Sequence, residues 1–165
     1  MSATQTRCGF VAVLGAPNSG KSTLVNTAVG QKVSIVTQKV QTTRMPVRGI
    51  AMRGETQLIF VDTPGIFTPK RGLDRAMVQA AWGGAADADV VLLTVDSQEL
   101  ARHRKGLSGR DTDRIIEGLK TSGRRAALVL NKVDALKRVA LLPLAEELNA
   151  TGIFARVFMI SALSG

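Results

Sequence analysis

The stretch Gly15-Ala16-Pro17-Asn18-Ser19-Gly20-Lys21-Ser22 decides the fold that this sequence predicts. An apolar run, residues 10–14, precedes it, and apolar residues at helical spacing follow it as far as Gly30. Strand, glycine-bounded loop and helix, in this order, form the context in which the pattern G-x-x-x-x-G-K-S/T binds phosphate. Gly15 and Gly20 let the backbone wrap around an anion because they carry no Cβ. The alternative is a glycine-rich turn that matches the pattern by accident.

The residue types of this loop predict individual contacts with a nucleotide. Lys21 is expected to reach the outer phosphates, and the Ser22 hydroxyl is expected to bind Mg²⁺. Amides of the loop and the N-terminus of the following helix are expected to form the anion site. The other nucleotide contacts expected here are Gly15, Ala16, Pro17, Asn18, Ser19, Gly20 and Thr23.

Composition describes a chain that can fold as one domain. It has 165 residues, of which 45% are hydrophobic, which is typical of globular rather than disordered proteins. The single cysteine, Cys8, excludes an internal disulfide and fits a reducing compartment. No apolar run approaches the ~20 residues of a membrane span. The net charge of +9 favours polyanionic partners such as nucleotides or RNA.

Expected strands and helices alternate along the rest of the chain. The expected strands are 47–52, 57–61, 90–95, 126–130 and 157–160, and the expected helices are 74–86, 111–122 and 141–149. Residues 97–110 are polar and are expected to form a loop with some helical turn. Alternation predicts parallel pairing with right-handed crossovers, whereas the turn at Gly54 predicts one antiparallel edge strand. The predicted fold class is α/β: a three-layer α/β/α sandwich around a mostly parallel six-stranded sheet.

Three further motifs follow expected strands, so they should meet the phosphate loop at the carboxyl edge of the sheet. Asp62 can hold Mg²⁺ and the Gly65 amide can contact a γ-phosphate. The Asp134 carboxylate can accept hydrogen bonds from the ring N–H and the amino group of guanine, which favours GTP over ATP. The expected contacts from these motifs are Asp62, Thr63, Pro64, Gly65, Asn131, Lys132, Asp134, Ser161, Ala162 and Leu163.

Two other function classes compete with a GTP-hydrolysing switch. A metabolic kinase would use the same phosphate loop, but it gives no reason for the guanine motif at residues 131–134. An RNA-binding module with little catalysis would explain the positive charge, but it leaves Lys21, Ser22 and Asp62 unexplained. Phosphate release from GTP, with and without RNA, separates the three.

The chain resembles the Era family of bacterial GTPases, which assist assembly of the small ribosomal subunit. The resemblance covers essentially the whole chain, and the related Der and tRNA-modification GTPases remain alternatives because they share most of the motifs. It is carried by residues 15–22, 30–37, Gln41-Thr42-Thr43-Arg44, 62–65, 131–134 and 161–162.

The resemblance implies a P-loop GTPase fold that binds GTP or GDP with Mg²⁺. Ser22, Asp62 and Thr43, with Thr42 as the alternative to Thr43, are the implied Mg²⁺ ligands. Catalysis is implied for Lys21, Thr43 and Gly65. Ile66 stands where a water-orienting side chain is sought in Ras-like proteins.

Asn18 occupies the position at which related GTPases bind K⁺ beside the phosphates. Asn18 as a K⁺ ligand is one interpretation, and local support of the loop by its side chain is the other.

The family also implies partners beyond this domain. Residues 1–165 correspond to the GTP-binding domain, and we expect a final helix and an RNA-binding KH domain to follow in a longer protein. That KH domain would bind small-subunit rRNA in the 30S subunit. Lack of the final helix predicts an exposed apolar patch on the sheet. The implied location is cytoplasmic, with peripheral association at the inner membrane as a further expectation, and the present chain is expected to be monomeric.

Overall fold

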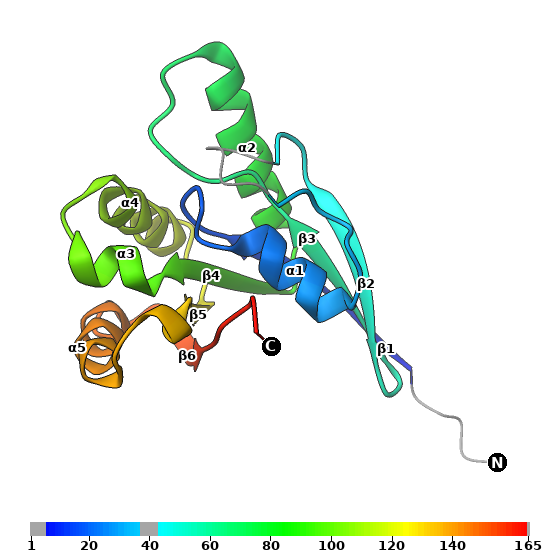
Figure 1. Ribbon diagram of the computed structural model, residues 1–165. Coiled ribbons are helices and arrows are strands. Elements are labelled where there is room, and N and C mark those ends of the chain that lie inside the picture. The colour runs from blue at the N-terminus through cyan, green and yellow to red at the C-terminus, as the bar shows by residue number, and fades with distance from the viewer. Residues whose placement is uncertain (1–5, 37–42, 165) are drawn as a thin grey trace.

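The computed structural model describes residues 6–36 and 43–164 (Figure 1). Within them, six strands form one sheet in the order β2-β3-β1-β4-β5-β6. All neighbouring strands are parallel except β2 and β3, which pair antiparallel at one edge. The predicted α/β fold class, with its single antiparallel edge strand, is confirmed.

Strands and helices alternate along the chain as the sequence predicts. The strands are β1 (Arg7–Leu14), β2 (Val47–Arg53), β3 (Thr56–Asp62), β4 (Val90–Asp96), β5 (Ala126–Asn131) and β6 (Phe154–Met159). The helices are α1 (Lys21–Val29), α2 (Gly72–Ala86), α3 (Ser97–Arg102), α4 (Leu107–Thr121) and α5 (Arg138–Asn149), with a short 3₁₀ turn at Val133–Ala135.

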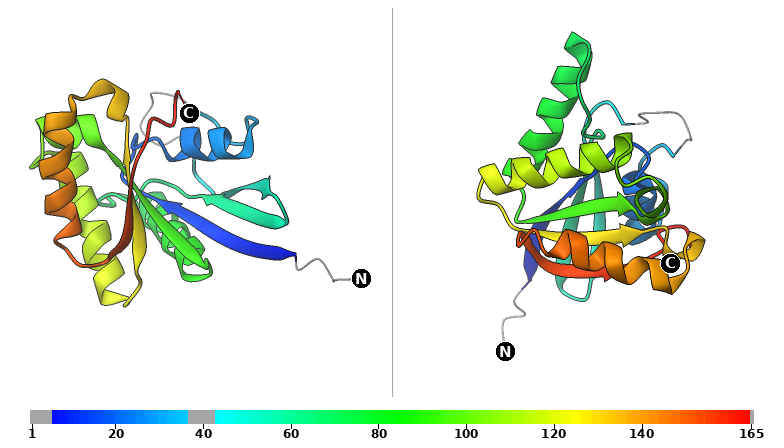
Figure 2. Two further views of the ribbon diagram at one scale, coloured as in Figure 1. Left: turned by 90° about the horizontal axis from the view of Figure 1, so that it is seen from below. Right: turned by 90° about the vertical axis from the view of Figure 1, so that its left-hand side faces the viewer.

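The two faces of the sheet are covered unequally. The connection from β1 to β3 moves along the sheet in one direction, and the connections from β3 to β4, β5 and β6 move in the other. Because crossovers are right-handed, this reversal puts α1 on one face and the other helices on the opposite face, as Figure 2 shows. The reversal occurs at β1, so the loop after β1 lies where ligands bind in open α/β sheets.

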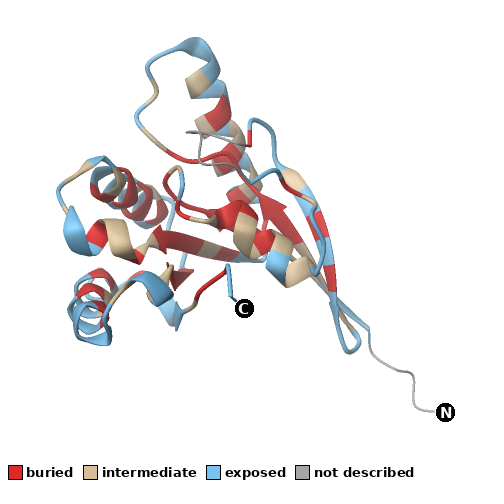
Figure 3. Cartoon of the chain, in the orientation of Figure 1, coloured by how far each residue is buried: buried red, intermediate tan, exposed pale blue. Residues whose placement is uncertain are grey.

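The core lies where the sheet meets its helices, and Figure 3 shows the buried residues concentrated there. Every residue of β5 is buried. The larger buried cluster joins β1, β4 and β5 to α2, α4 and α5, and a smaller one joins β1, β2 and β3 to α1. At about 25 cal/mol per Å² of buried apolar surface, these clusters are the main favourable contribution to folding.

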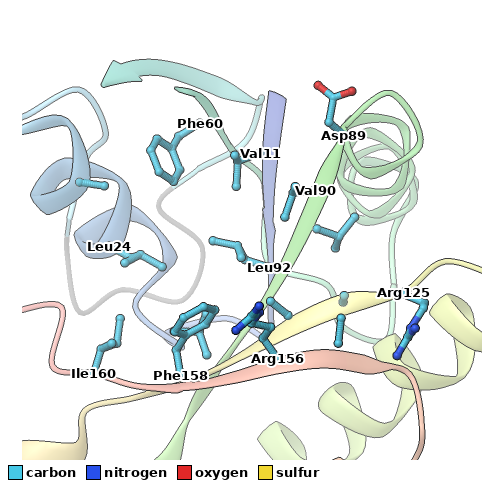
Figure 4. Close-up of a pocket in the computed structure, with 16 residues that line it drawn as sticks. Val11, Leu24, Phe60, Asp89, Val90, Leu92, Arg125, Arg156, Phe158 and Ile160 are labelled. Carbon is cyan, nitrogen blue, oxygen red and sulfur yellow. The ribbon is translucent and has the colours of Figure 1, made fainter. Parts of the chain in front are cut away.

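The face that carries α1 is only partly covered, as the sequence predicts. A groove of about 610 Å³ lies beside α1 over β4, β5 and β6 (Figure 4). Its lining is apolar apart from Asp89, Arg125 and Arg156. Within it Val90 is 47% exposed and Phe158 is 46% exposed, so the expected apolar patch is present.

The clearest differences from the predicted elements concern α3, α4, β6 and α5. Residues 97–102 form α3, since the Asp96 carboxylate accepts a hydrogen bond from the Glu99 amide and starts a helix. Helix α4 begins at Leu107 rather than at the predicted residue 111. The glycine at 109 weakens the helical pattern of the sequence, but in the structure it packs against the Arg104 carbonyl within the first turn of the helix.

Strand β6 begins at Phe154, three residues before the predicted start. A register irregularity between Ala126 and Ala127 of β5 puts an extra residue into β6 and breaks the alternation expected of a strand. Helix α5 begins at Arg138, three residues before the predicted start, since its exposed first turn carries no apolar periodicity.

Candidate functional site

The loop between β1 and α1 is shaped by glycines that leave no room for a Cβ. A Cβ on Gly15 would lie 2.3 Å from the Thr94 carbonyl oxygen, and one on Gly20 would lie 2.1 Å from the Asn131 side-chain nitrogen. Gly20 also has φ 91°, in the left-handed region that glycine adopts without strain. The loop is thereby pressed against the ends of β4 and β5, and its amides lie at the start of α1.

Lys21, the first residue of α1, is buried, and its ammonium group lies inside the loop. Its Nζ donates hydrogen bonds to the carbonyl oxygens of Gly15 at 3.2 Å and Ala16 at 2.9 Å. Burial lowers the pKa of Lys21 to about 8, and the nearby Asp62 carboxylate opposes this effect. A cation that is held beside the loop and is short of solvation favours a bound polyanion.

Three oxygen-bearing side chains meet at the start of α1. The Ser22 hydroxyl donates to Asp62 Oδ2 at 2.7 Å, and the Thr43 hydroxyl lies 3.2 Å from the same oxygen. Ser22 Oγ and Thr43 Oγ1 are 3.3 Å apart. All three residues are buried, so the structure brings together the side chains that the sequence assigns to Mg²⁺. Thr42 lies outside the described residues.

This cluster is chemically suited to Mg²⁺. Hydroxyl and carboxylate oxygens are the hard ligands that Mg²⁺ takes in phosphate sites. Asp62 Oδ1 is buried and has no hydrogen-bond partner among the described residues, which leaves one carboxylate oxygen with lone pairs to offer. A buried charged oxygen without a partner is costly, and a cation would remove that cost.

The residues after Asp62 are fixed against the phosphate loop. The Thr63 hydroxyl donates to the Val13 carbonyl at 2.7 Å, and the Ile66 amide donates to the Gly15 carbonyl at 3.0 Å. A Cβ on Gly65 would lie 2.9 Å from the Pro17 nitrogen, so only glycine fits this approach. Pro64 is buried in the same segment.

The opposite end of the site is organised by Asn131, the last residue of β5. Its Nδ2 donates to the Ser19 carbonyl at 3.0 Å, and its Oδ1 accepts from the Ala162 amide at 2.9 Å. One buried amide side chain therefore joins the phosphate loop to the segment after β6. The Ala162 carbonyl in turn accepts a hydrogen bond from Thr27 of α1 at 2.6 Å.

The next two motif residues project from the sheet edge. The backbone of Lys132 is in the left-handed region, at φ 61°. Its Nζ donates a hydrogen bond to the Asn18 carbonyl at 2.8 Å, so the side chain supports the phosphate loop. The same ammonium group pairs with Asp96 Oδ2 at 2.5 Å. Asp134 lies exposed in the 3₁₀ turn. Leu163, two residues after Ser161 in the segment that follows β6, is 85% exposed.

Two contributing residues were not found by sequence reasoning. Asp96 is the last residue of β4 and directly follows the apolar run 90–95, a position that indicates the carboxyl edge of the sheet, so its role could have been inferred. Thr27 offers no such signal, since its contact with Ala162 spans 135 residues and depends on tertiary packing.

Asn26 of α1 holds the first part of the segment that leads to Thr43. Its Oδ1 accepts from the amides of Val33 at 2.9 Å and Ser34 at 2.8 Å, and its Nδ2 donates to the Ser34 carbonyl at 2.9 Å. The residue expected at 41 lies outside the described residues, and Arg44, next to Thr43, is exposed.

The chain is similar to proteins of a known family. Residues 10–132 match the family described as 50S ribosome-binding GTPase. The chain is 55% identical over 172 residues to GTPase Era of Maricaulis maris, and 56% identical over 169 residues to GTPase Era of Caulobacter vibrioides. These alignments cover 100% and 98% of this chain, but 55% and 54% of the relatives.

Solved structures give the same likeness. An Era crystal structure in complex with MgGDPNP and nucleotides 1506–1542 of 16S ribosomal RNA is 37% identical, with a TM-score of 0.84 over 98% of this chain and 53% of that one. A variant of Aquifex aeolicus Era bound to GDP and AlF₄⁻ is 37% identical, with a TM-score of 0.83 over 97% of this chain. The chain thus spans about half the length of the relatives that it matches.

Proposed function

Since this chain belongs to the 50S ribosome-binding GTPase family, we propose that it binds GTP with Mg²⁺, hydrolyses it to GDP and phosphate, and acts as a switch of the Era type. The observation that carries the proposal is the buried cluster of Asp62, Ser22 and Thr43. It lies beside the buried ammonium group of Lys21. Solved relatives with MgGDPNP and with GDP and AlF₄⁻ support the choice of nucleotide and metal.

In this proposal the chain's own groups bind and orient the nucleotide. Loop amides and the Lys21 ammonium receive the phosphates, and Asp134 accepts hydrogen bonds from guanine. Bound Mg²⁺ would neutralise charge on the outer phosphates. The Gly65 amide, held close to Pro17, is suited to orient the terminal phosphate, and Thr43 is suited to report its presence.

The side chain that follows Gly65 does not activate water. Ile66 is fully buried and apolar, so it cannot hold a water by a hydrogen bond. Catalysis therefore rests on electrostatic stabilisation by Lys21 and Mg²⁺ together with backbone amides. The slow ~10⁻⁴ s⁻¹ of unassisted Ras is the scale of rate that we expect.

The test is release of phosphate from GTP. We expect release with GTP and Mg²⁺, none with ATP, and loss of nucleotide binding in Lys21→Ala. A kinase would instead need an acceptor and would transfer phosphate from ATP. Binding of RNA without any nucleotide turnover would favour the RNA-binding module.

We further propose K⁺ as an activating ion bound with the help of Asn18. The Asn18 side chain is exposed at the mouth of the phosphate loop, and its amide oxygen is a hard donor suited to an alkali cation. Its backbone is in the left-handed region, at φ 62°, which asparagine tolerates better than most residues. Backbone conformation alone is therefore a second reason for asparagine at this position.

The two reasons are separated by replacing Asn18 with glycine, which accepts φ 62° and lacks the amide. We expect faster hydrolysis in K⁺ than in Na⁺ for the natural chain and equal rates for Asn18→Gly. Equal rates in both salts for the natural chain, at saturating Mg²⁺, would rule out the K⁺ proposal.

The proposals that concern the whole protein rest on its relatives. The Era structure with 16S ribosomal RNA supports the proposal that the whole protein binds small-subunit rRNA in the 30S subunit. We assign this binding to a KH domain after the GTP-binding domain, as the family resemblance implies. A cytoplasmic location, peripheral association with the inner membrane and a monomeric state of the present chain are further proposals. In the part of the chain that the structure describes, no helix is long and apolar enough to cross a membrane.

The present domain should then bind RNA only by charge. We expect its RNA binding to weaken steeply between 50 and 200 mM salt, because the contacts would be to phosphates. Tight, sequence-selective binding at physiological salt by residues 1–165 would contradict the assignment of RNA recognition to a separate domain.

A further inference from the structure

Asp111 of α4 is a buried acid for which the nucleotide site has no use. Only 8% of its surface is exposed. Burial raises the pKa of its carboxyl group, and three groups oppose this: Arg114, the Thr68 backbone amide and Arg110. Arg114 and Arg110 lie on α4 itself. Thr68 belongs to a different part of the chain, the segment 66–71 that connects the Asp62 motif to α2.

Arg114 makes a second contact with the same loop residue. Its Nη1 donates to Thr68 Oγ1 at 2.6 Å. Asp111 and Arg114 are three residues apart in a helix, so they lie on one face of α4. The Arg114 guanidinium therefore holds the side chain of Thr68, and the Asp111 carboxylate lies on the same helix face, near the Thr68 amide.

The segment 66–71 is fixed at both of its ends as well. At its start, the Ile66 amide donates to the Gly15 carbonyl and the Ile66 side chain is fully buried. At its end, the amides of Lys70 and Arg71 both donate to Asp74 Oδ2 at 3.0 Å. Between these two anchors, the hydrogen bond from Arg114 to Thr68 is a further contact that joins the loop to α4.

Helix α4 is a firm support for these contacts. Arg104 pairs with Asp113 of α4 at 2.7 Å and with Glu147 of α5 at 2.7 Å. A Cβ on Gly109 would lie 1.8 Å from the Arg104 carbonyl oxygen, so the first turn of α4 packs directly on the preceding segment.

We propose that Asp111 and Arg114 form a clasp on Thr68 that holds the segment after Gly65 in the position that serves GTP rather than GDP. The same structure has Thr43 in contact with Asp62 and Ser22, the residues assigned to Mg²⁺, and contacts of the γ-phosphate and Mg²⁺ order the switch segments of GTPases. Asp111 and Arg114 are thus positioning residues, since neither contacts the nucleotide site. This inference rests on the proposed GTPase function.

The test compares affinities for GDP and for a non-hydrolysable GTP analogue, measured by calorimetry with Mg²⁺. Thr68→Val keeps the shape of the side chain and removes the acceptor for Arg114, whereas Thr68→Ser keeps that acceptor. Thr68 is exposed, so both variants should fold. We expect Thr68→Val and Asp111→Ala to weaken the GTP analogue by about two- to tenfold, the range for one hydrogen bond, and to leave GDP unchanged. Thr68→Ser and Asp111→Asn should behave like the natural chain.

Matched controls lie on the same helix. Glu117→Ala and Lys120→Ala remove an exposed acid and an exposed base of α4 and should leave both affinities unchanged. Hydrogen exchange of the amides at 66–71, measured with the GTP analogue bound, should be faster in Thr68→Val than in Thr68→Ser. Hydrogen exchange measures the opening of this loop directly. A general loss of stability would raise exchange throughout the protein and not at residues 66–71 alone.

The outcomes separate the clasp from the proposed function. If the natural chain bound neither nucleotide, the GTPase proposal itself would fail. If it bound both and Thr68→Val changed neither affinity, or lowered the two equally, the clasp would have no part in choosing GTP. A selective loss of GDP affinity would assign the clasp to the opposite state and overturn the inference.

Discussion

Lys21 is a buried cation whose charge the folded chain tolerates at a cost in stability. Its pKa is lowered to about 8 because burial penalises the charged form. That penalty is complete below pH 8 and disappears as the pH rises toward the ordinary pKa of about 10.4 for lysine. We expect Lys21→Met to unfold at higher temperature than the natural chain at pH 7, with a gain on the order of 2 kcal/mol, and to lose nucleotide binding. Thermal unfolding and GDP titration measure the two effects.

The same group should make nucleotide binding depend on pH. Phosphate beside the ammonium group raises its pKa, so binding above pH 8 takes up a proton. We expect the affinity for GDP to fall by up to about tenfold per unit between pH 8 and 9.5. Lys120→Met, an exposed lysine of α4, should leave this pH profile unchanged. A flat profile up to pH 9.5 would show that Lys21 keeps its proton in the free protein.

Asp134 is the residue on which base choice should depend. Asn in its place offers a mixed donor and acceptor, so the guanine amino group would lose a charged partner. Such a hydrogen bond contributes about 1.5–3 kcal/mol, which is roughly tenfold to over a hundredfold in affinity. We expect Asp134→Asn to bind GTP more weakly and xanthosine triphosphate more tightly, as measured by competition. Unchanged GTP affinity would remove guanine recognition from Asp134.

At the scale of elements, one buried amide couples three segments. Asn131 at the end of β5 bonds both the phosphate loop and the segment after β6. Asn131→Ala would leave the Ser19 carbonyl and the Ala162 amide without their partner, at about 1–3 kcal/mol each. We expect a lower melting temperature together with weaker binding of GDP and GTP alike.

Asn149→Ala is the matched control, because that side chain is exposed at the end of α5. Thermal unfolding and calorimetry of the two variants should differ clearly. Similar losses in both would mean that Asn131 does not couple the segments.

Sequence reasoning succeeded where the local pattern and the final packing agree. The strand–loop–helix at Gly15–Ser22 and the continuous apolar run of β5, every residue of which is buried, predict their elements directly, since such burial leaves a plain apolar signature. Where contacts between distant segments determine an element, the local sequence pattern does not predict it. The start of β6 depends on a bulge opposite β5, and α3 depends on a cap supplied by Asp96.

The candidate site shows the same division. The meeting of Ser22 and Asp62 follows from two motifs at the ends of neighbouring strands. The contacts of Thr68 with Arg114 span 46 residues and follow from no motif, because they depend on where α4 lies beside the loop.

At the scale of the whole molecule, the groove beside α1 is an exposed apolar surface. Exposed apolar patches of this kind favour contact between copies. We expect residues 1–165 to be monomeric when dilute and to associate as the concentration rises. Phe158→Glu, inside the groove (Figure 4), should suppress that association in sedimentation experiments while GDP binding persists.

Val139→Glu provides the comparison, because Val139 is 83% exposed on α5 and lies outside the groove lining. It removes a similar apolar group and adds the same charge. If Val139→Glu suppressed association as strongly as Phe158→Glu, net charge and not the groove would be responsible.

The hydrogen bond from Asn131 to Ser19 has a consequence for how the protein is made. Its partners are 112 residues apart in the chain. At ribosomal synthesis rates of about 5–20 residues per second, roughly 6 to 20 s pass between the two being made. During that time the nascent polypeptide contains the phosphate loop but not the residues to which we assign guanine recognition, so we expect it not to discriminate between nucleotides. Discrimination among cellular nucleotides should therefore arise late in biosynthesis, when the segment at Ala162 has left the ribosome and closed on Asn131.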